Sequence, residues 1–254
     1  MSGVFTPAPG AAPFAPQVLA QAGMESRLMV RNGEQLILAV VIPVIVLVAA
    51  VQGADRVGLD FSRPTVDIFA PGVLALAVMS TAFTSLAIAT GFERRYGVIK
   101  RLGSSPLSRT GLLVGKIGAL LLIEVLQIVV ISAVALGLGW EPSPDLAAAA
   151  LAVVVGTAAF AALGLLLAGA LRAEATLAAA NLVYLLLMAG GAVVLPVSAY
   201  GDFGDVVRWL PSGALGDAMR DALTLGTTSW RDLAVLLAWA AVGAVLTART
   251  FKWE

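Results

Sequence analysis

The sequence places one carboxylate, Glu124, deep within a long apolar stretch, with an amide three residues further on at Gln127. Residues three apart lie on the same face of a helix. Asn181 and Tyr184 repeat this spacing in a later apolar stretch. Ionisable groups inside a membrane are costly and commonly mark the route of a substrate. We therefore treat these four residues as candidates for a translocation path that contacts a polar or cationic part of a substrate.

Two other interpretations of Glu124 stay open. A protonated carboxyl in a medium of low dielectric constant can act in packing alone, by hydrogen bonding across helices. Its partners would be Gln127, Asn181 or the hydroxyls of Thr81, Thr84 and Ser85. Glu124 can instead relay protons, which would make the chain a proton-coupled secondary transporter. Against this alternative, the apolar stretches hold one carboxylate and show no internal repeat.

The chain lacks the residue types that most often carry out catalysis. The chain contains no cysteine and no histidine, which excludes disulfides, thiol nucleophiles and Ser-His-Asp triads. Residues 111–116 resemble a phosphate-binding loop but are one residue too short, and Ile117 follows where Ser or Thr is needed. Gly111 and Gly115 instead indicate a close contact between helices. We expect a non-catalytic protein with no metal and no cofactor of its own.

Composition indicates an integral membrane protein. Of the 254 residues, 59% are hydrophobic and 13% are charged, against about 45–50% and about 25% in soluble domains. Apolar runs of about twenty residues cross a bilayer as helices. The sequence offers six such runs, at residues 36–51, 68–92, 117–138, 146–171, 177–197 and 233–248. We expect an all-α fold of six transmembrane helices, the first of which continues through Pro43 as a kinked helix.

The residues before the first span differ from the rest. Residues 1–16 are rich in proline and glycine and are expected to be disordered. Residues 17–34 mix apolar and charged side chains, which favours an amphipathic helix on the membrane surface over a solvated linker. Residues 35–254 would then form the six-span domain.

The distribution of charge predicts the orientation. Sixteen Lys and Arg balance sixteen Asp and Glu, so the chain lacks the electrostatic footprint of a nucleic-acid-binding protein. Eleven of the basic residues fall on the side of the two termini and five on the other. Because Lys and Arg near span ends are retained in the cytoplasm, both termini are expected there.

The densest basic segment lies between the second and third spans. Residues 93–109 hold five Lys or Arg against one Glu, interleaved with apolar residues. This pattern predicts a short amphipathic helix from Glu93 to Leu102, because Gly103 and Pro106 stop its continuation. A helix of this kind needs a surface to dock into. The alternative is a loop that rests on anionic head groups.

This loop resembles the cytoplasmic loop of type-2 ATP-binding-cassette exporter permeases. The matching residues are Glu93-Arg94-Arg95, Gly97, Leu102, Ser105-Pro106-Leu107 and Gly115-Lys116. The resemblance extends over residues 27–43 and 195–220 and leaves out the Pro-rich start.

The resemblance implies a permease that is driven by a separate ATPase. Two copies of that ATPase subunit would bind the ATP and Mg, and a second permease, identical or homologous, would complete the dimer in the cytoplasmic membrane of a bacterium. The loop would then be the coupling helix, in contact with the ATPase. Its charged contacts would come from Arg94, Arg95 and Arg101, and its apolar contacts from Val98, Ile99 and Leu102. The substrate would be an amphiphile such as a drug, lipid or glycolipid.

The segment between the last two spans completes the resemblance. In the family it often dips into the membrane as short helices, which makes Pro196, Trp209 and Pro211 candidates for an outer gate. Trp209 also fits the simpler role of an anchor at the membrane surface.

Overall fold

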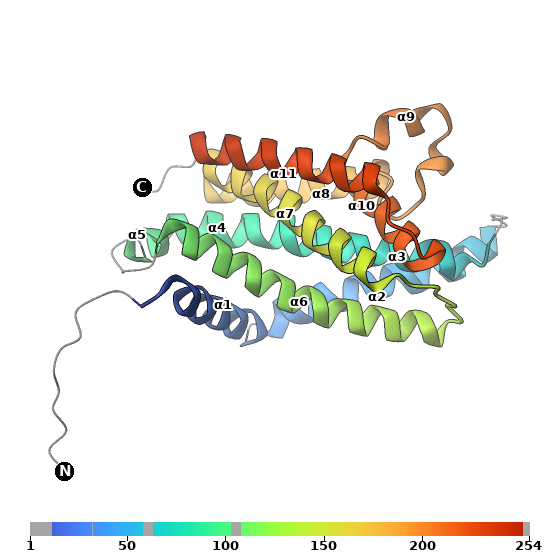
Figure 1. Cartoon of the computed structure of the whole chain (residues 1–254), viewed down its shortest axis with the longest axis horizontal. Coiled ribbons are helices and arrows are strands. Elements are labelled where there is room, and N and C mark those ends of the chain that lie inside the picture. Colours follow the sequence, from blue (N-terminus) through green and yellow to red (C-terminus); the bar gives the residue numbers. More distant parts are fainter. Residues whose placement is uncertain (1–11, 32, 58–62, 103–107, 251–254) are drawn as a thin grey trace, which may run out of the picture.

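The computed structural model of the chain is built from helices packed side by side. It describes residues 12–31, 33–57, 63–102 and 108–250, and within these ranges every regular element is helical. The elements are α1 (Phe14–Arg31), α2 (Gly33–Val57), α3 (Thr65–Met79), η1 (Ser80–Ser85), α4 (Leu86–Arg95), α5 (Val98–Leu102), α6 (Arg109–Gly137), α7 (Leu146–Ala170), α8 (Ala173–Gly190), η2 (Val197–Phe203), α9 (Gly204–Val207), α10 (Pro211–Arg220), η3 (Asp221–Leu225) and α11 (Trp230–Thr250). Figure 1 shows α5 at one end of the bundle and α9 at the opposite end.

Five of the described helical segments are long and apolar enough to cross a membrane, so the chain is a multi-pass membrane protein. They are Thr65–Arg95, Thr110–Gly137, Leu146–Ala170, Ala173–Gly190 and Trp230–Thr250. Helix α2 runs through Pro43 as one helix, as expected. Its apolar part, Ala39–Ala54, is shorter than the about twenty residues that span a bilayer. The predicted count of six spans is therefore not confirmed.

Several predicted boundaries differ from the structure, and two of the differences have a clear local cause. Helix α1 begins at Phe14 rather than 17, because a proline such as Pro16 is tolerated in the first turn, where its missing N–H has no helical partner. The fifth span was expected to reach 197, but α8 ends at Gly190. Ala192 there has a φ of 56°, which a continuing right-handed helix does not allow.

The segment Thr65–Arg95 is not a regular α-helix throughout. Its middle, η1, is a π-helical turn that carries Ser80, Thr81, Thr84 and Ser85. π-Turns inside α-helices often occur at functional sites. Helix α7 lies close to this turn, since a Cβ at Gly164 would be 2.8 Å from the carbonyl oxygen of Phe83. The small residues of α7 thus allow the close packing that helices in lipid use.

Candidate functional site

Three charged residues from three helices meet near the α5 end of the bundle. The Lys116 Nζ of α6 lies 2.9 Å from Glu25 Oε1 of α1 and 2.7 Å from Glu93 Oε1 of α4. Lys116 is only 5% exposed. At the preceding residue, a Cβ on Gly115 would lie 2.6 Å from Cγ of Gln21, which is the close contact that Gly115 indicated. Helix α1 is thus held against α6 by both shape and charge.

The basic loop is two helices rather than the single one predicted from Glu93 to Leu102. Helix α4 continues to Arg95, and α5 starts only at Val98. Gly97 between them has a φ of 69°, in the left-handed region where glycine commonly ends helices. Glu93 therefore belongs to the membrane-spanning segment Thr65–Arg95, and its carboxylate pairs with Lys116 inside the chain.

Helix α5 turns one apolar residue inward and several residues outward. Ile99 is buried, and Leu102 is half-buried. Val98, Lys100 and Arg101 are exposed. Pro106, the last residue assigned to this loop motif, lies outside the described residues. The exposed side of α5 is thus both basic and apolar, as an amphipathic docking helix requires.

Arg94 and Arg95 bind within the chain. Arg94 donates hydrogen bonds to the carbonyl oxygens of Ala168 and Leu171, where α7 ends. Arg95 forms an ion pair with Glu174 in the first turn of α8. A cation at a helix C-terminus binds carbonyls that have no helical partner and complements the helix dipole. Both arginines were predicted to contact an ATPase, which stays a prediction; within the chain they join α4 to the α7–α8 junction.

The four candidate path residues lie in two separate pairs. Glu124 and Gln127 are fully buried on α6. Glu124 accepts a hydrogen bond of 2.6 Å from Thr157 of α7. Gln127 accepts one of 2.9 Å from Thr81 of η1 and donates one of 2.8 Å to the carbonyl of Ala39. Both side chains thus form hydrogen bonds to neighbouring helices, as expected if they act in packing.

The second pair lies on α8, on the other side of η1. Asn181 is exposed, and Tyr184 is half-buried and hydrogen bonded to Ser80. The π-turn therefore separates the two pairs: its Thr81 meets α6 and its Ser80 meets α8. Thr157 was missed as a partner of Glu124, although it is the only hydroxyl residue within α7 and could have been named on that ground.

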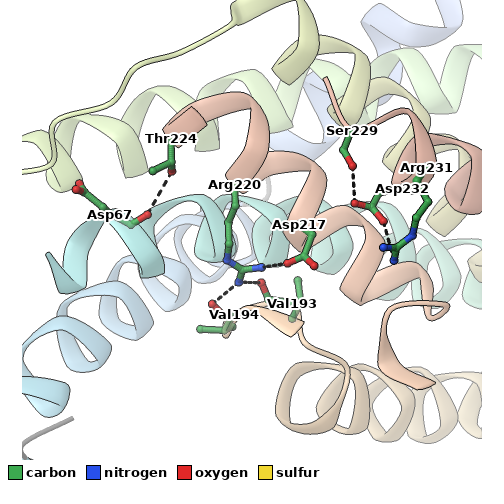
Figure 2. Close-up of polar contacts among 9 residues, drawn as sticks. All are labelled: Asp67, Val193, Val194, Asp217, Arg220, Thr224, Ser229, Arg231 and Asp232. Carbon is green, nitrogen blue, oxygen red and sulfur yellow. Dashed lines mark hydrogen bonds and ion pairs between the residues drawn. The ribbon is translucent and has the colours of Figure 1, made fainter. Parts of the chain in front are cut away.

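At the opposite end of the bundle, Arg220 fastens the segment between the last two spans (Figure 2). Its guanidinium donates to the carbonyl oxygens of Val193 and Val194, at 2.8 and 2.6 Å, and to Asp217 Oδ1 at 2.9 Å. Burial lowers the pKa of Arg220, and the Asp217 carboxylate opposes that shift. Burial likewise raises the pKa of Asp217, against the effect of Arg220. Sequence reasoning missed this pair; its signal is two opposite charges three residues apart in a short, otherwise small and apolar helix.

The three candidate gate residues have different surroundings. Pro196 is the N-cap residue of η2, and Pro211 is the first residue of α10, so each proline lies at the start of a helix. Trp209 is 60% exposed, and its carbonyl accepts a hydrogen bond of 2.8 Å from the Trp239 indole of α11. The arrangement fits an interfacial anchor that is tied to the last span.

These features define a multi-pass helical membrane domain. Glu124 and Gln127 are buried within it, and charged residues join its helices at both ends. Comparison with known proteins identifies the domain further. The family model of the ABC-2 family transporter protein matches residues 60–249. The chain belongs to this family, and it is an ABC-2 type permease, whose family implies an ATP-binding-cassette ATPase as partner. No curated protein matches the chain.

Proposed function

We propose that this chain is the permease subunit of an ATP-driven exporter in the cytoplasmic membrane of a bacterium. It moves an amphiphilic substrate with energy from ATP hydrolysed by two copies of a separate ATPase subunit. Family membership supports the ATPase partner. The observation that carries the coupling role is α5, where Val98, Lys100 and Arg101 are exposed around a buried Ile99.

The contacts behind α5 suit the transmission of movement. Helix α4 is joined to α5 through Gly97, and its Glu93 binds Lys116 of α6. Its Arg94 holds the end of α7, and Arg95 holds the start of α8. A displacement of α5 by a closing ATPase would therefore reach three other spans through direct polar contacts. Arg94 and Arg95 act as connecting residues in this mechanism, rather than as contacts with the ATPase.

A second permease would complete the path. Helix α8 is the most exposed of the five spans, and Asn181 lies on its exposed side. A polar amide that faces hydrocarbon is costly, and amides commonly bond between helices in membranes. We infer that α8 faces the partner permease, so that Asn181 and Tyr184 lie beside the substrate path and Glu124 and Gln127 stabilise the bundle. Residues 191–229, the segment between α8 and α11, form what we call the outer hairpin. With Pro196, Trp209 and Pro211, it would close that path.

The double charge reversal Lys100→Glu and Arg101→Glu tests the docking surface. It replaces the basic side of α5 without touching Ile99, and we expect it to weaken binding of the ATPase about tenfold or more through like-charge repulsion. Co-purification of the cognate ATPase with tagged permease measures the effect. The matched control is Arg56→Glu with Arg63→Glu, exposed residues near the other end of the bundle. Equal recovery of ATPase with both double variants would contradict the proposal.

The variant Glu124→Gln separates the transporter mechanisms. The glutamine side chain cannot carry a proton, but its oxygen still accepts the hydrogen bond from Thr157. If Glu124 acts only in packing, ATP hydrolysis by the reconstituted complex is therefore expected to be unchanged. Thr157→Val, which leaves the carboxyl without its donor, should lower the Tm instead. The measurements are ATP hydrolysis and proton uptake in proteoliposomes. Proton uptake by the parent protein that disappears with Glu124→Gln would favour a proton-coupled transporter.

A further inference from the structure

A cavity of about 870 Å³ lies between the end of α4, the α7–α8 junction and the end of α11. These segments meet at the end of the bundle where α5 lies (Figure 1). The volume falls within the about 300–1,000 Å³ of small-molecule sites. The lining holds one carboxylate, Glu174, and four arginines, which are Arg94, Arg95, Arg172 and Arg249. The cavity is therefore lined mainly by positive charge.

Two of these arginines bring a charge to the cavity that nothing in the described part of the chain balances. Arg95 pairs with Glu174, the one carboxylate among the lining residues. Arg172 and Arg249 are exposed, and neither forms an ion pair or a side-chain hydrogen bond with a described residue. They come from segments about 75 residues apart in the sequence and repel each other across one cavity. An anion bound between them would remove that repulsion.

The position of the cavity indicates which anion is at hand. Four of the five apolar spans have an end in its lining, at Arg95, Ala170, Ala173 and Thr250. The cavity therefore lies where the hydrocarbon of the membrane gives way to head groups and water. Basic pockets between transmembrane helices bind phosphate-bearing head groups at this level. Guanidinium groups bind phosphate through two parallel hydrogen bonds, which an ammonium group cannot form.

The backbone at the cavity adds to the same preference. Ala173 and Glu174, the first two residues of α8, belong to the lining. No side chain caps this helix, since the N-cap residue Arg172 has no acceptor to offer the first N–H groups. Phosphate commonly binds N–H groups at the start of a helix. The N-terminus of α8 thus supports the arginines and does not define the site alone.

The cavity is separate from the exposed side of α5. Val98, Lys100 and Arg101 do not line it. It is instead built around the contacts by which Arg94 and Arg95 join α4 to α7 and α8. An anion held by Arg172 and Arg249 would add the end of α11 to that junction. Occupancy of the cavity and docking of the ATPase on α5 can therefore be measured independently.

We propose that this cavity binds the phosphate group of a phosphate ester at the membrane surface, with Arg172 and Arg249 as its main contacts. The membrane offers this group as the head of an anionic phospholipid, and the aqueous phase offers it as a soluble phosphate compound. The bound phosphate joins the end of α11 to the α7–α8 junction. The site does not depend on what the permease transports.

Native mass spectrometry of the full-length permease, purified with its cognate ATPase, tests the proposal. The complex is titrated with phosphatidylglycerol or with phosphatidylcholine of the same acyl chains, and the parent is expected to retain phosphatidylglycerol several-fold better. Arg172→Gln with Arg249→Gln should lower the affinity for phosphatidylglycerol about thirtyfold, because two basic side chains near an anionic group contribute together about 2 kcal/mol. The Tm should not change, since both arginines are exposed and unpaired among the described residues.

The matched control removes two other arginines. Arg27→Gln with Arg31→Gln changes the charge equally on exposed positions of α1, outside the cavity lining. This variant should keep the preference for phosphatidylglycerol. Equal losses from the two double variants would overturn the proposal, because general attraction of a basic surface to anionic lipid would then explain the preference.

The source of the phosphate is tested in nanodiscs of phosphatidylcholine alone, by calorimetric titration with inorganic phosphate. Phosphate binding that disappears with Arg172→Gln and Arg249→Gln supports the site with a soluble phosphate compound as its ligand. A preference for phosphatidylglycerol without binding of inorganic phosphate supports the site with a lipid head group. A parent protein that shows neither response would overturn the proposal.

Co-purification of the ATPase separates this site from a docking surface. The Arg172→Gln and Arg249→Gln variant should recover as much ATPase as the parent, because the exposed residues of α5 are unchanged. Loss of the ATPase with this variant would assign the two arginines to the ATPase interface and would overturn the phosphate site. Loss of the ATPase with the α5 variant alone would leave the phosphate site supported.

Discussion

Replacing Lys116 with alanine is expected to lower the free energy of unfolding by about 3–5 kcal/mol, because the change leaves a buried ion cluster without its cation. Glu25 and Glu93 approach the same ammonium group at 2.9 and 2.7 Å, and Lys116 is buried. Without it, two carboxylates from α1 and α4 face each other at the α6 surface. Denaturant unfolding in mixed micelles, followed by circular dichroism, measures the loss.

The control for this prediction removes all three charges together. The triple variant Glu25→Gln, Glu93→Gln and Lys116→Met should recover much of the lost stability, since amides and an apolar chain need no counter-charge. A Lys116→Ala protein as stable as the parent, or a triple variant as unstable as the single one, would show that the cluster does not hold α1 and α4 to α6.

The second large effect is expected at Arg220. Arg220→Leu removes three hydrogen bonds, leaves the carbonyls of Val193 and Val194 without their donor, and leaves Asp217 without a counter-charge. Such a loss costs about 3–5 kcal/mol. Arg220→Lys should recover only part of it, because an ammonium lacks the planar fork that serves both carbonyls and the carboxylate. Limited proteolysis of the hairpin, together with the Tm, measures the effect.

A matched arginine lies nearby. Arg208 pairs with Asp205 in the same outer segment, also three residues apart, at 3.3 Å, but Asp205 is largely exposed. Exposed pairs contribute about 0–1 kcal/mol, so Arg208→Leu should change the Tm little. Comparable losses from Arg208→Leu and Arg220→Leu would contradict the assignment of Arg220 as the fastening residue.

The sequence predicted a helix correctly where a long apolar run follows a clear helix-capping residue. The fourth span was expected at 146–171 and is observed as α7, Leu146–Ala170, because a long apolar run starts directly after Asp145, whose carboxylate caps the helix. The basic loop was found by composition alone, and its likeness to type-2 exporter permeases agrees with the family match.

The sequence did not predict the features whose conformation or partners depend on tertiary contacts. Nothing in the order of residues around Ser80 distinguishes a π-turn from an α-helix, because the turn depends on what packs against it. The partners of Arg94 and Arg95 come from α7 and α8, about 75 residues further on, and no local pattern reveals them. Gly97 was noted as part of the motif, yet its left-handed φ, which splits the loop into two helices, follows only from the fold.

Site-specific cross-linking from α5 tests directly whether this helix contacts the ATPase. The chain has no cysteine, so Val98→Cys places a single thiol on the exposed side of α5, and Arg63→Cys places one near the opposite end of the bundle. A thiol-to-amine cross-linker is applied to permeabilised membranes that hold the permease and its cognate ATPase, and adducts are identified by mass spectrometry. We expect ATPase peptides linked to position 98 and none linked to position 63. Adducts from position 98 without ATPase peptides, or equal yields from both positions, would contradict a contact between α5 and the ATPase.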